Sequence, residues 1–321
     1  MSFTNFLYNQ KITSGEHKMI KTTAIIGMGA LGLLYADVIV KTMGNEAVSF
    51  IMNEERVNRN KGKVFHCNGV EKQFQITDCN QAKPVDFLIV AVKYNGLQQA
   101  LEDMKNCIDE HTIIMSVMNG IDSEDIIAGR YGKKHLVYTV AQGMDAMKFD
   151  DTLTYTKMGE LRVGVIEESQ QDNLKKVQEF FDFISMPYTV ESDILYRIWG
   201  KFMLNVGVNQ TCMAFETNYG GVLVEGSQEN EVYTGAMREV IALANKKGIS
   251  LSDKDLQEYI ALTRTLNPQG MPSMRQDGVS KRLSEVEMFA GTVRRLSKEE
   301  GLATPVNDYL YERIKKMEAA Y

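Results

Sequence analysis

Short apolar runs, separated by longer polar or helical segments, dominate the first half of the chain. Four of these runs have the length and composition of buried strands: Thr23–Ile26, Val48–Met52, Phe87–Val92 and Ile113–Val117. Between the first two, Leu31 to Thr42 has apolar residues at helical spacing and is followed by Gly44. Continuous apolar strands joined by crossover segments predict a parallel sheet covered on both faces.

The pattern changes near Glu191. Before it, strand-like runs at His135–Ala141 and Glu160–Ile166 are expected to extend the sheet, and Asn173–Ile184 has helical spacing. After it, every remaining segment has a helical pattern: Asp193–Met213, Gln228–Lys247, Asp253–Leu266, Glu285–Glu300 and Pro305–Ala319. We therefore predict an α/β fold, with a parallel-sheet domain over residues 19–191 and an all-α domain over residues 192–321. The polar segment before them, Met1–Lys18, is predicted to be a loose tail.

A glycine-rich turn joins the first strand to the first helix. The motif G-x-G-x-x-G is formed by Gly27, Met28, Gly29, Ala30, Leu31 and Gly32. In this context Gly27 permits the tight turn, Gly29 lets the backbone approach a pyrophosphate, and Gly32 lets the helix pack on the sheet. We therefore predict that the N-terminal domain is a Rossmann-type dinucleotide-binding domain. A structural turn without a ligand is the alternative.

The end of the second strand bears on which dinucleotide binds. An acidic residue there favours NAD, whereas a nearby arginine favours the 2′-phosphate of NADP. Here the strand ends in the neutral Asn53, and Arg56 follows three residues later. We predict NADP(H) with Arg56 as the phosphate contact, and leave NAD(H) open.

Composition and charge narrow the remaining choices. Of the 321 residues, 44% are hydrophobic and 24% charged, which disfavours disorder, and the net charge of −6 disfavours a nucleic-acid partner. The four cysteines and four histidines form no C-x-x-C or H-E-x-x-H spacing, so we expect no metal. No segment has the pattern of a signal peptide or membrane span, so we expect a cytoplasmic protein without a membrane partner.

A polar stripe interrupts the apolar helix predicted at Asp193–Met213. Lys201, Asn205 and Asn209 are spaced i, i+4, i+8 and therefore share one helix face. Burying such groups without partners is costly, so the stripe is expected to face a cleft rather than a dry core. A desolvated ammonium suits ketone reduction because it can stabilise and protonate the alkoxide that hydride transfer creates. An ordinary solvent-facing stripe is the alternative.

These motifs together resemble the ketopantoate reductase (2-dehydropantoate 2-reductase) family over nearly the whole chain. The landmarks occur in the family's order: the turn GMGALG, VAVK ending at Lys93, MNG containing Asn119, WGKFMLNVGVNQ, PSMRQD containing Ser273, and SEVE containing Glu285. The resemblance implies a dinucleotide-binding domain and a helical domain with the active site between them. The sequence leaves the oligomeric state open and allows a homodimer.

The resemblance also implies roles for individual residues. Lys201 would be the general acid, and Glu285 would bind a substrate hydroxyl and help orient the lysine. Asn205 and Asn209 would line the substrate site. Three further residues complete the set: Ser273 on the substrate carboxylate, Asn119 near the nicotinamide and the substrate, and Lys93 along the cofactor.

Some positions have simpler explanations or depart from the family pattern. Ser284 to Glu287 reads as a capping box, and Ser273 could cap a helix after Pro272. Asn53 replaces an arginine that the family often has, and Gly270 stands near where some members have a substrate-binding asparagine.

Three functions are therefore considered: reduction of 2-dehydropantoate to (R)-pantoate with NADPH, reduction of another 2-oxo acid, or a non-catalytic dinucleotide sensor.

Overall fold

The structure is a computed structural model that describes residues 19–321, and the predicted tail Met1–Lys18 lies outside this range. Its N-terminal part is built on a five-stranded parallel sheet in the order β5-β2-β1-β6-β7. The strands are β1 (Thr23–Ile26), β2 (Val48–Met52), β5 (Gln75–Asp78), β6 (Phe87–Val90) and β7 (Ile113–Ser116). This order is that of a Rossmann-type sheet, so the predicted fold class is confirmed.

Helices cover both faces of this sheet. They are α2 (Ala30–Met43), α3 (Glu54–Asn60), α4 (Leu97–Asp103), α5 (Ser123–Tyr131) and α6 (Gln171–Ile184). Alternate strand residues supply the two apolar layers, because successive side chains of a strand point to opposite faces. Ile25 packs in the layer that includes α2 and α6, whereas its neighbours Ala24 and Ile26 pack in the layer that includes α4 and α5.

Two smaller sheets flank the main one. β8 (Tyr138–Gln142), β11 (Glu160–Gly164) and β12 (Tyr188–Val190) form one, in which β8 and β11 pair antiparallel. The other contains β3 (Phe65–Cys67), β4 (Val70–Lys72), β9 (Met147–Phe149) and β10 (Thr152–Thr154). The expectation that the runs at His135–Ala141 and Glu160–Ile166 extend the main sheet was therefore wrong in part. In the described part of the chain an isolated bridge from Ile114 to Leu136 links them to β7, and β8 pairs with β11 in a separate sheet.

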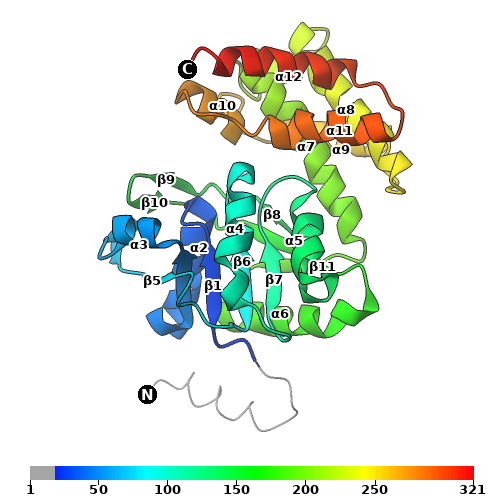
Figure 1. Cartoon of the computed structure of the whole chain (residues 1–321). Coiled ribbons are helices and arrows are strands. Elements are labelled where there is room, and N and C mark those ends of the chain that lie inside the picture. Colours follow the sequence, from blue (N-terminus) through cyan, green and yellow to red (C-terminus); the bar gives the residue numbers. More distant parts are fainter. Residues whose placement is uncertain (1–18) are drawn as a thin grey trace.

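The rest of the chain is helical and forms the upper part of the molecule in Figure 1. Its helices are α7 (Ile194–Ala214), α8 (Gln228–Lys246), α9 (Asp253–Arg264), α10 (Ser273–Val279), α11 (Thr292–Glu299) and α12 (Pro305–Glu318). Its apolar core lies around α7 and α8 and includes Met203, Tyr233 and Met237. α7 runs upward from the α/β part into this bundle (Figure 1).

The predicted helix Glu285–Glu300 differs from the structure at its start. Glu285 lies before the helix, which opens with a π-helical turn over Glu287–Gly291 and continues as α11. The capping box is not formed, because the Ser284 N–H and hydroxyl both donate to Glu318 Oε1, at 2.8 and 2.6 Å. Glu285 is thereby held in a non-helical segment.

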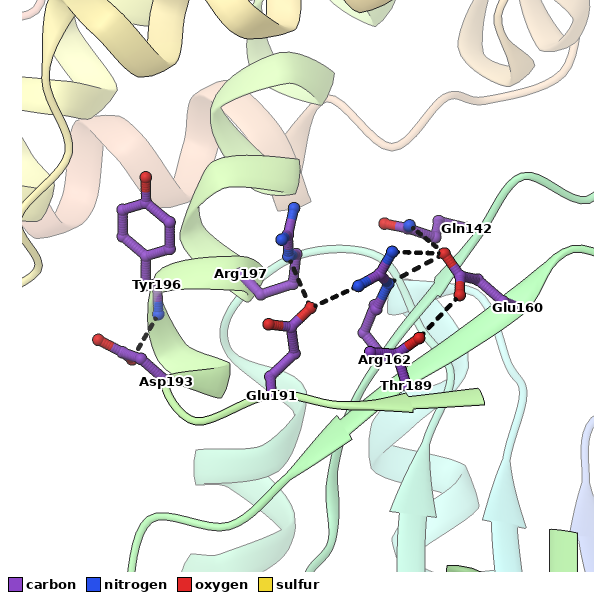
Figure 2. Close-up of polar contacts among 8 residues, drawn as sticks. All are labelled: Gln142, Glu160, Arg162, Thr189, Glu191, Asp193, Tyr196 and Arg197. Atoms are coloured by element: carbon purple, nitrogen blue, oxygen red, sulfur yellow. Dashed lines mark hydrogen bonds and ion pairs between the residues drawn. The ribbon is translucent and has the colours of Figure 1, made fainter. Parts of the chain in front are cut away.

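A cluster of ion pairs fixes the point where α7 leaves the β11–β12 sheet (Figure 2). Glu191 Oε1 accepts hydrogen bonds from both Arg162 and Arg197, each at 3.0 Å. Arg162 also pairs with Glu160 at 2.7 Å. Asp193 caps the helix by accepting a hydrogen bond from the Tyr196 backbone N–H at 3.0 Å. The first turn of α7 is therefore tied to both neighbouring strands.

Candidate active site

The glycine turn lies at the carboxyl end of β1, beside the end of β6. Gly27 has φ +108°, and a Cβ placed there would lie 2.4 Å from the Ala91 carbonyl oxygen. A Cβ at Gly32 would lie 2.0 Å from the Gly27 carbonyl oxygen. A Cβ at Gly29, by contrast, would meet nothing within 4 Å. Gly27 and Gly32 are therefore required by packing, whereas the space at Gly29 is open.

The start of α2 fits a pyrophosphate. Its N-cap is Gly29, which offers no side-chain hydrogen bond, and its first turn carries no acidic residue. The backbone N–H groups contributed by Ala30, Leu31 and Gly32 are thus left without a side-chain cap, next to the positive end of the helix dipole. The turn, including Met28, lies between β1 and β6, where the strand order of the sheet reverses and such folds bind their ligands.

Asn53 and Arg56 lie at the end of β2, the strand next to β1. Asn53 is the N-cap of α3, and its Oδ1 accepts a hydrogen bond from the Arg56 backbone N–H at 3.1 Å. The Arg56 side chain is only partly buried in the first turn of that helix. Both residues therefore lie at the sheet edge that carries the glycine turn.

Lys201 lies on the part of α7 that faces the sheet domain. Its Nζ donates to Asn119 Oδ1 at 2.9 Å and to the Ala141 carbonyl oxygen at 2.7 Å. Burial lowers the pKa of this ammonium to about 8, and the negative charges of Glu285 and Glu124 oppose the shift. The third proton on Nζ remains for another acceptor.

Glu285 lies near the Lys201 ammonium on the side of the helical part. Burial raises the pKa of its carboxyl, while the charges of Lys93 and Lys201 and a hydrogen bond from Asn119 act in the opposite direction. The predicted residues Lys93, Asn119, Lys201 and Glu285, which are far apart in sequence, therefore come together at one place.

Asp277 of α10 belongs to this group and was missed by the sequence reasoning. Its carboxylate accepts from Lys93 Nζ at 2.8 Å and from Arg282 Nε at 3.0 Å, while the residue is 5% exposed. Its position four residues after Ser273, on the same helix face, was the available signal.

The predicted substrate residues form a chain of hydrogen bonds along α7. Asn209 Nδ2 donates to Asn205 Oδ1 at 3.3 Å, and Ser273 Oγ donates to Asn209 Oδ1 at 3.3 Å. The predicted stripe on α7 thus continues into the start of α10. Ser273 is the first residue of α10, and its side chain is directed to Asn209.

A small cavity of about 10 Å³ adjoins Lys201, which is room for about one water molecule. It is lined by Met118, Asn119, Gly120, Thr139, Val140, Ile198, Lys201, Phe202 and Asn205. The wall residues Thr139 and Val140 were not singled out from the sequence, because β8 carries no motif. The cavity has less room than an organic acid needs, so we expect the surrounding elements to separate when a substrate enters.

Comparisons with known proteins identify the family of the chain. Residues 23–168 match the family described as ketopantoate reductase PanE/ApbA, and residues 193–318 match the C-terminal part of the same family. The chain belongs to the ketopantoate reductase family. Relatives named 2-dehydropantoate 2-reductase include one from Streptococcus pyogenes serotype M6, 23% identical over 92% of this chain and 97% of the relative. Another, from Aquifex aeolicus, is 25% identical over 94% of this chain and 98% of the relative.

Solved structures share the fold. A D-mandelate dehydrogenase in complex with NADH superposes with a TM-score of 0.82 at 24% identity, covering 93% of this chain and 99% of that one. A ketopantoate reductase from Staphylococcus aureus, described as dimeric, has a TM-score of 0.77 at 18% identity, with the same coverage. The fold is thus shared by enzymes named for different 2-oxo or 2-hydroxy acids.

Two features are absent from the described part of the chain. Within residues 19–321, no three His, Cys, Asp or Glu side chains gather so that they could hold a metal ion. None of the helices in the same range combines the length and apolarity that crossing a membrane requires.

Proposed function

We propose that the protein reduces the ketone of 2-dehydropantoate to (R)-pantoate with NADPH, a step towards pantothenate and coenzyme A. The observation that carries this proposal is the desolvated Lys201 ammonium, whose two acceptors, Asn119 and the Ala141 carbonyl, leave one N–H for a substrate oxygen. A dinucleotide sensor has no need for such a group beside the partly buried carboxyl group of Glu285. We also propose that residues 19–191 form the dinucleotide domain and residues 192–321 the substrate domain.

Each side chain then has a defined task. NADPH, when bound, would supply a hydride for the ketone carbon. Lys201 stabilises the developing alkoxide and donates its proton to that oxygen. Glu285 accepts a hydrogen bond from a substrate hydroxyl and steadies the lysine, and Asn119 orients both groups. Ser273 holds the substrate carboxylate, and Asn205 and Asn209 line the substrate site.

The proposed cofactor contacts lie at the carboxyl ends of β1, β2 and β6. The turn from Gly27 to Gly32 and the start of α2 hold the pyrophosphate, and Lys93 lies along the cofactor. Arg56, with Asn53 beside it, contacts the 2′-phosphate and gives the preference for NADPH. Equal use of NADH and NADPH would contradict that preference while leaving the reductase proposal intact.

A panel of 2-oxo acids assayed by loss of NADPH and NADH absorbance tests the proposal. We expect 2-dehydropantoate with NADPH to give the highest kcat/KM. Lys201→Ala should lower kcat about 10²- to 10⁴-fold, the usual effect of a positioned acid, with an unchanged Kd for NADPH. The matched control is Lys254→Ala, because Lys254 lies on the outer surface and pairs only with Glu258 at 3.7 Å. Near-normal turnover by Lys201→Ala on every active substrate would refute this mechanism.

A second candidate is reduction of another 2-oxo acid with the same lysine. It is supported by the apolar part of the cavity wall, formed by Met118, Val140, Ile198 and Phe202, against which an apolar substrate side chain would pack once the surrounding elements separate. The similarity in fold to D-mandelate dehydrogenase points the same way. In the panel, a higher kcat/KM for an aromatic 2-oxo acid than for 2-dehydropantoate would favour this candidate.

A further inference from the structure

Glu124 is a buried acid that the mechanism above does not use. It lies in the first turn of α5 and is only 5% exposed. Its Oε2 accepts a hydrogen bond from Ser123 Oγ at 2.7 Å, and Ser123 Oγ lies 2.8 Å from Ser116 Oγ at the end of β7. A buried carboxyl with this set of partners is a built feature of the fold rather than a solvated surface charge.

The Glu124 carboxyl also lies next to the two segments that carry the hydrogen-bond acceptors of Lys201. The Thr139 backbone N–H also donates to it, and Thr139 lines the cavity beside Lys201. Two residues further along β8 is Ala141, whose carbonyl accepts from Lys201. Asn119, the other acceptor, lies in the loop that leads into α5. Glu124 thus connects the two segments that carry both hydrogen-bond acceptors of the lysine.

We infer that Glu124 is a positioning residue for Lys201. It fixes α5 to β8, so that Asn119 and Ala141 keep their places, and its carboxylate supports the ammonium from the sheet side while Glu285 does so from the helical side. This inference rests on the proposed function, in which Lys201 must be charged in order to donate a proton.

The electrostatics agree with this geometry. Burial raises the pKa of Glu124 to about 7, and the charge of Glu124 opposes the burial that lowers the pKa of Lys201 to about 8. Asp125 and Tyr138 are the other titratable neighbours on the sheet side. The negative charge of Glu124 therefore acts against the loss of the Lys201 proton.

The test compares Glu124→Gln with Asp125→Asn, which removes the same formal charge from the neighbouring, exposed position. We expect Glu124→Gln to move the basic limb of the kcat/KM profile to lower pH by about one unit, because an opposing charge is lost. Asp125→Asn should leave the limb in place, since an exposed charge is screened. Glu124→Asp keeps the charge, so its basic limb should lie close to that of the wild type. If the basic limb of Glu124→Gln lies within about 0.2 pH units of the wild-type limb, the inference is overturned.

A second readout does not depend on the substrate. The pH dependence of Lys201 labelling by acetic anhydride, followed by mass spectrometry, gives the titration of the lysine in the folded protein directly. If the wild type reduces no 2-oxo acid, the proposed function fails, yet a lower labelling midpoint in Glu124→Gln would still support the coupling. If Glu124→Gln does not fold, Ser123→Ala replaces it. Loss of the Ser123 hydrogen bond disfavours the ionised carboxyl, so a smaller shift in the same direction is expected, and an unchanged midpoint overturns the inference.

Discussion

At the scale of single residues, the site depends on one ammonium taken out of water. Lys201 has lost most of its hydration, and only two neutral oxygens contact it directly. The acids that favour its charge, Glu285 and Glu124, act by their field. Such an arrangement lowers the affinity of the lysine for its proton and so makes it a better proton donor near neutral pH.

This shift predicts a pH-dependent contribution to stability. The folded-state pKa of Lys201, about 8, lies below its ordinary value of 10.5, so the folded protein binds fewer protons than the unfolded chain between these two values. The free energy of unfolding should therefore rise with pH through this window. The contribution should be about 1 to 3 kcal/mol after allowance for partial exposure of the residue.

Urea unfolding at pH 8 and pH 10 would measure it. Lys201→Met should lack this component, so that the free energy of unfolding of the wild type rises relative to that of the variant between pH 8 and pH 10. Parallel pH dependences in the two proteins would contradict the assignment.

At the scale of elements, the strand–turn–helix unit carries two glycines with different tasks. Gly32→Ala places a Cβ 2.0 Å from the Gly27 carbonyl oxygen, so α2 must shift away from β1. We expect a loss of about 1 to 3 kcal/mol in the free energy of unfolding, as for overpacking of a core. Gly29→Ala has room for its Cβ and should be nearly neutral for stability, but it should weaken NADPH binding by blocking the approach of the pyrophosphate. Melting temperatures and cofactor titration would separate the two, and equal destabilisation would show that the glycines are equivalent.

The sequence predicted those elements whose burial is continuous. β1, β6 and β7 are buried at every residue, so their apolar runs are visible without any partner. β5 has no fully buried residue, and the exposed positions of β4 and β9 give no apolar run, so these strands were missed. They are strands because neighbouring segments pair with them, and that information is not local.

The sequence likewise revealed some residues of the candidate site and not others. Lys201, Asn205 and Asn209 stand out because polar residues at helical spacing interrupt an apolar helix. Asp277 and Glu124 do not stand out, because an acid in a short helix looks like a surface residue until its partners are known. For Asp277 that partner is Lys93, 184 residues away in sequence.

At the scale of the whole molecule, ion pairs join the sheet part to the helical part around the small cavity. Lys93 of the sheet part pairs with Asp277, and Asp122 pairs with Arg295 at 2.7 Å and accepts from Thr292 at 3.0 Å. Because the cavity beside Lys201 is smaller than a substrate, we expect these contacts to loosen for entry and to re-form on closure.

Asp277→Asn should therefore impair closure over the substrate. We expect kcat/KM to fall about 5- to 20-fold, equivalent to ~1–2 kcal/mol for a charged hydrogen bond whose lysine is partly exposed. Arg282→Ala, which removes the other partner of Asp277 without touching the sheet part, is the control and should have a smaller effect. Steady-state kinetics of both variants would decide, and a larger loss in Arg282→Ala would argue that Asp277 only stabilises α10.

The ion-pair cluster at the base of α7 has a mechanical consequence. With a rise of about 1.5 Å per residue, Lys201 lies about 6 Å and Asn209 about 18 Å along the helix from Arg197. A tilt of about 5° at that anchor would move Lys201 by about 0.5 Å but Asn209 by about 1.6 Å. α7 thus acts as a lever arm with the proton donor near its pivot and substrate recognition near its far end. Arg197→Ala, which removes one attachment to Glu191, should therefore raise KM more than it lowers kcat, whereas an equal effect on both would place the pivot elsewhere.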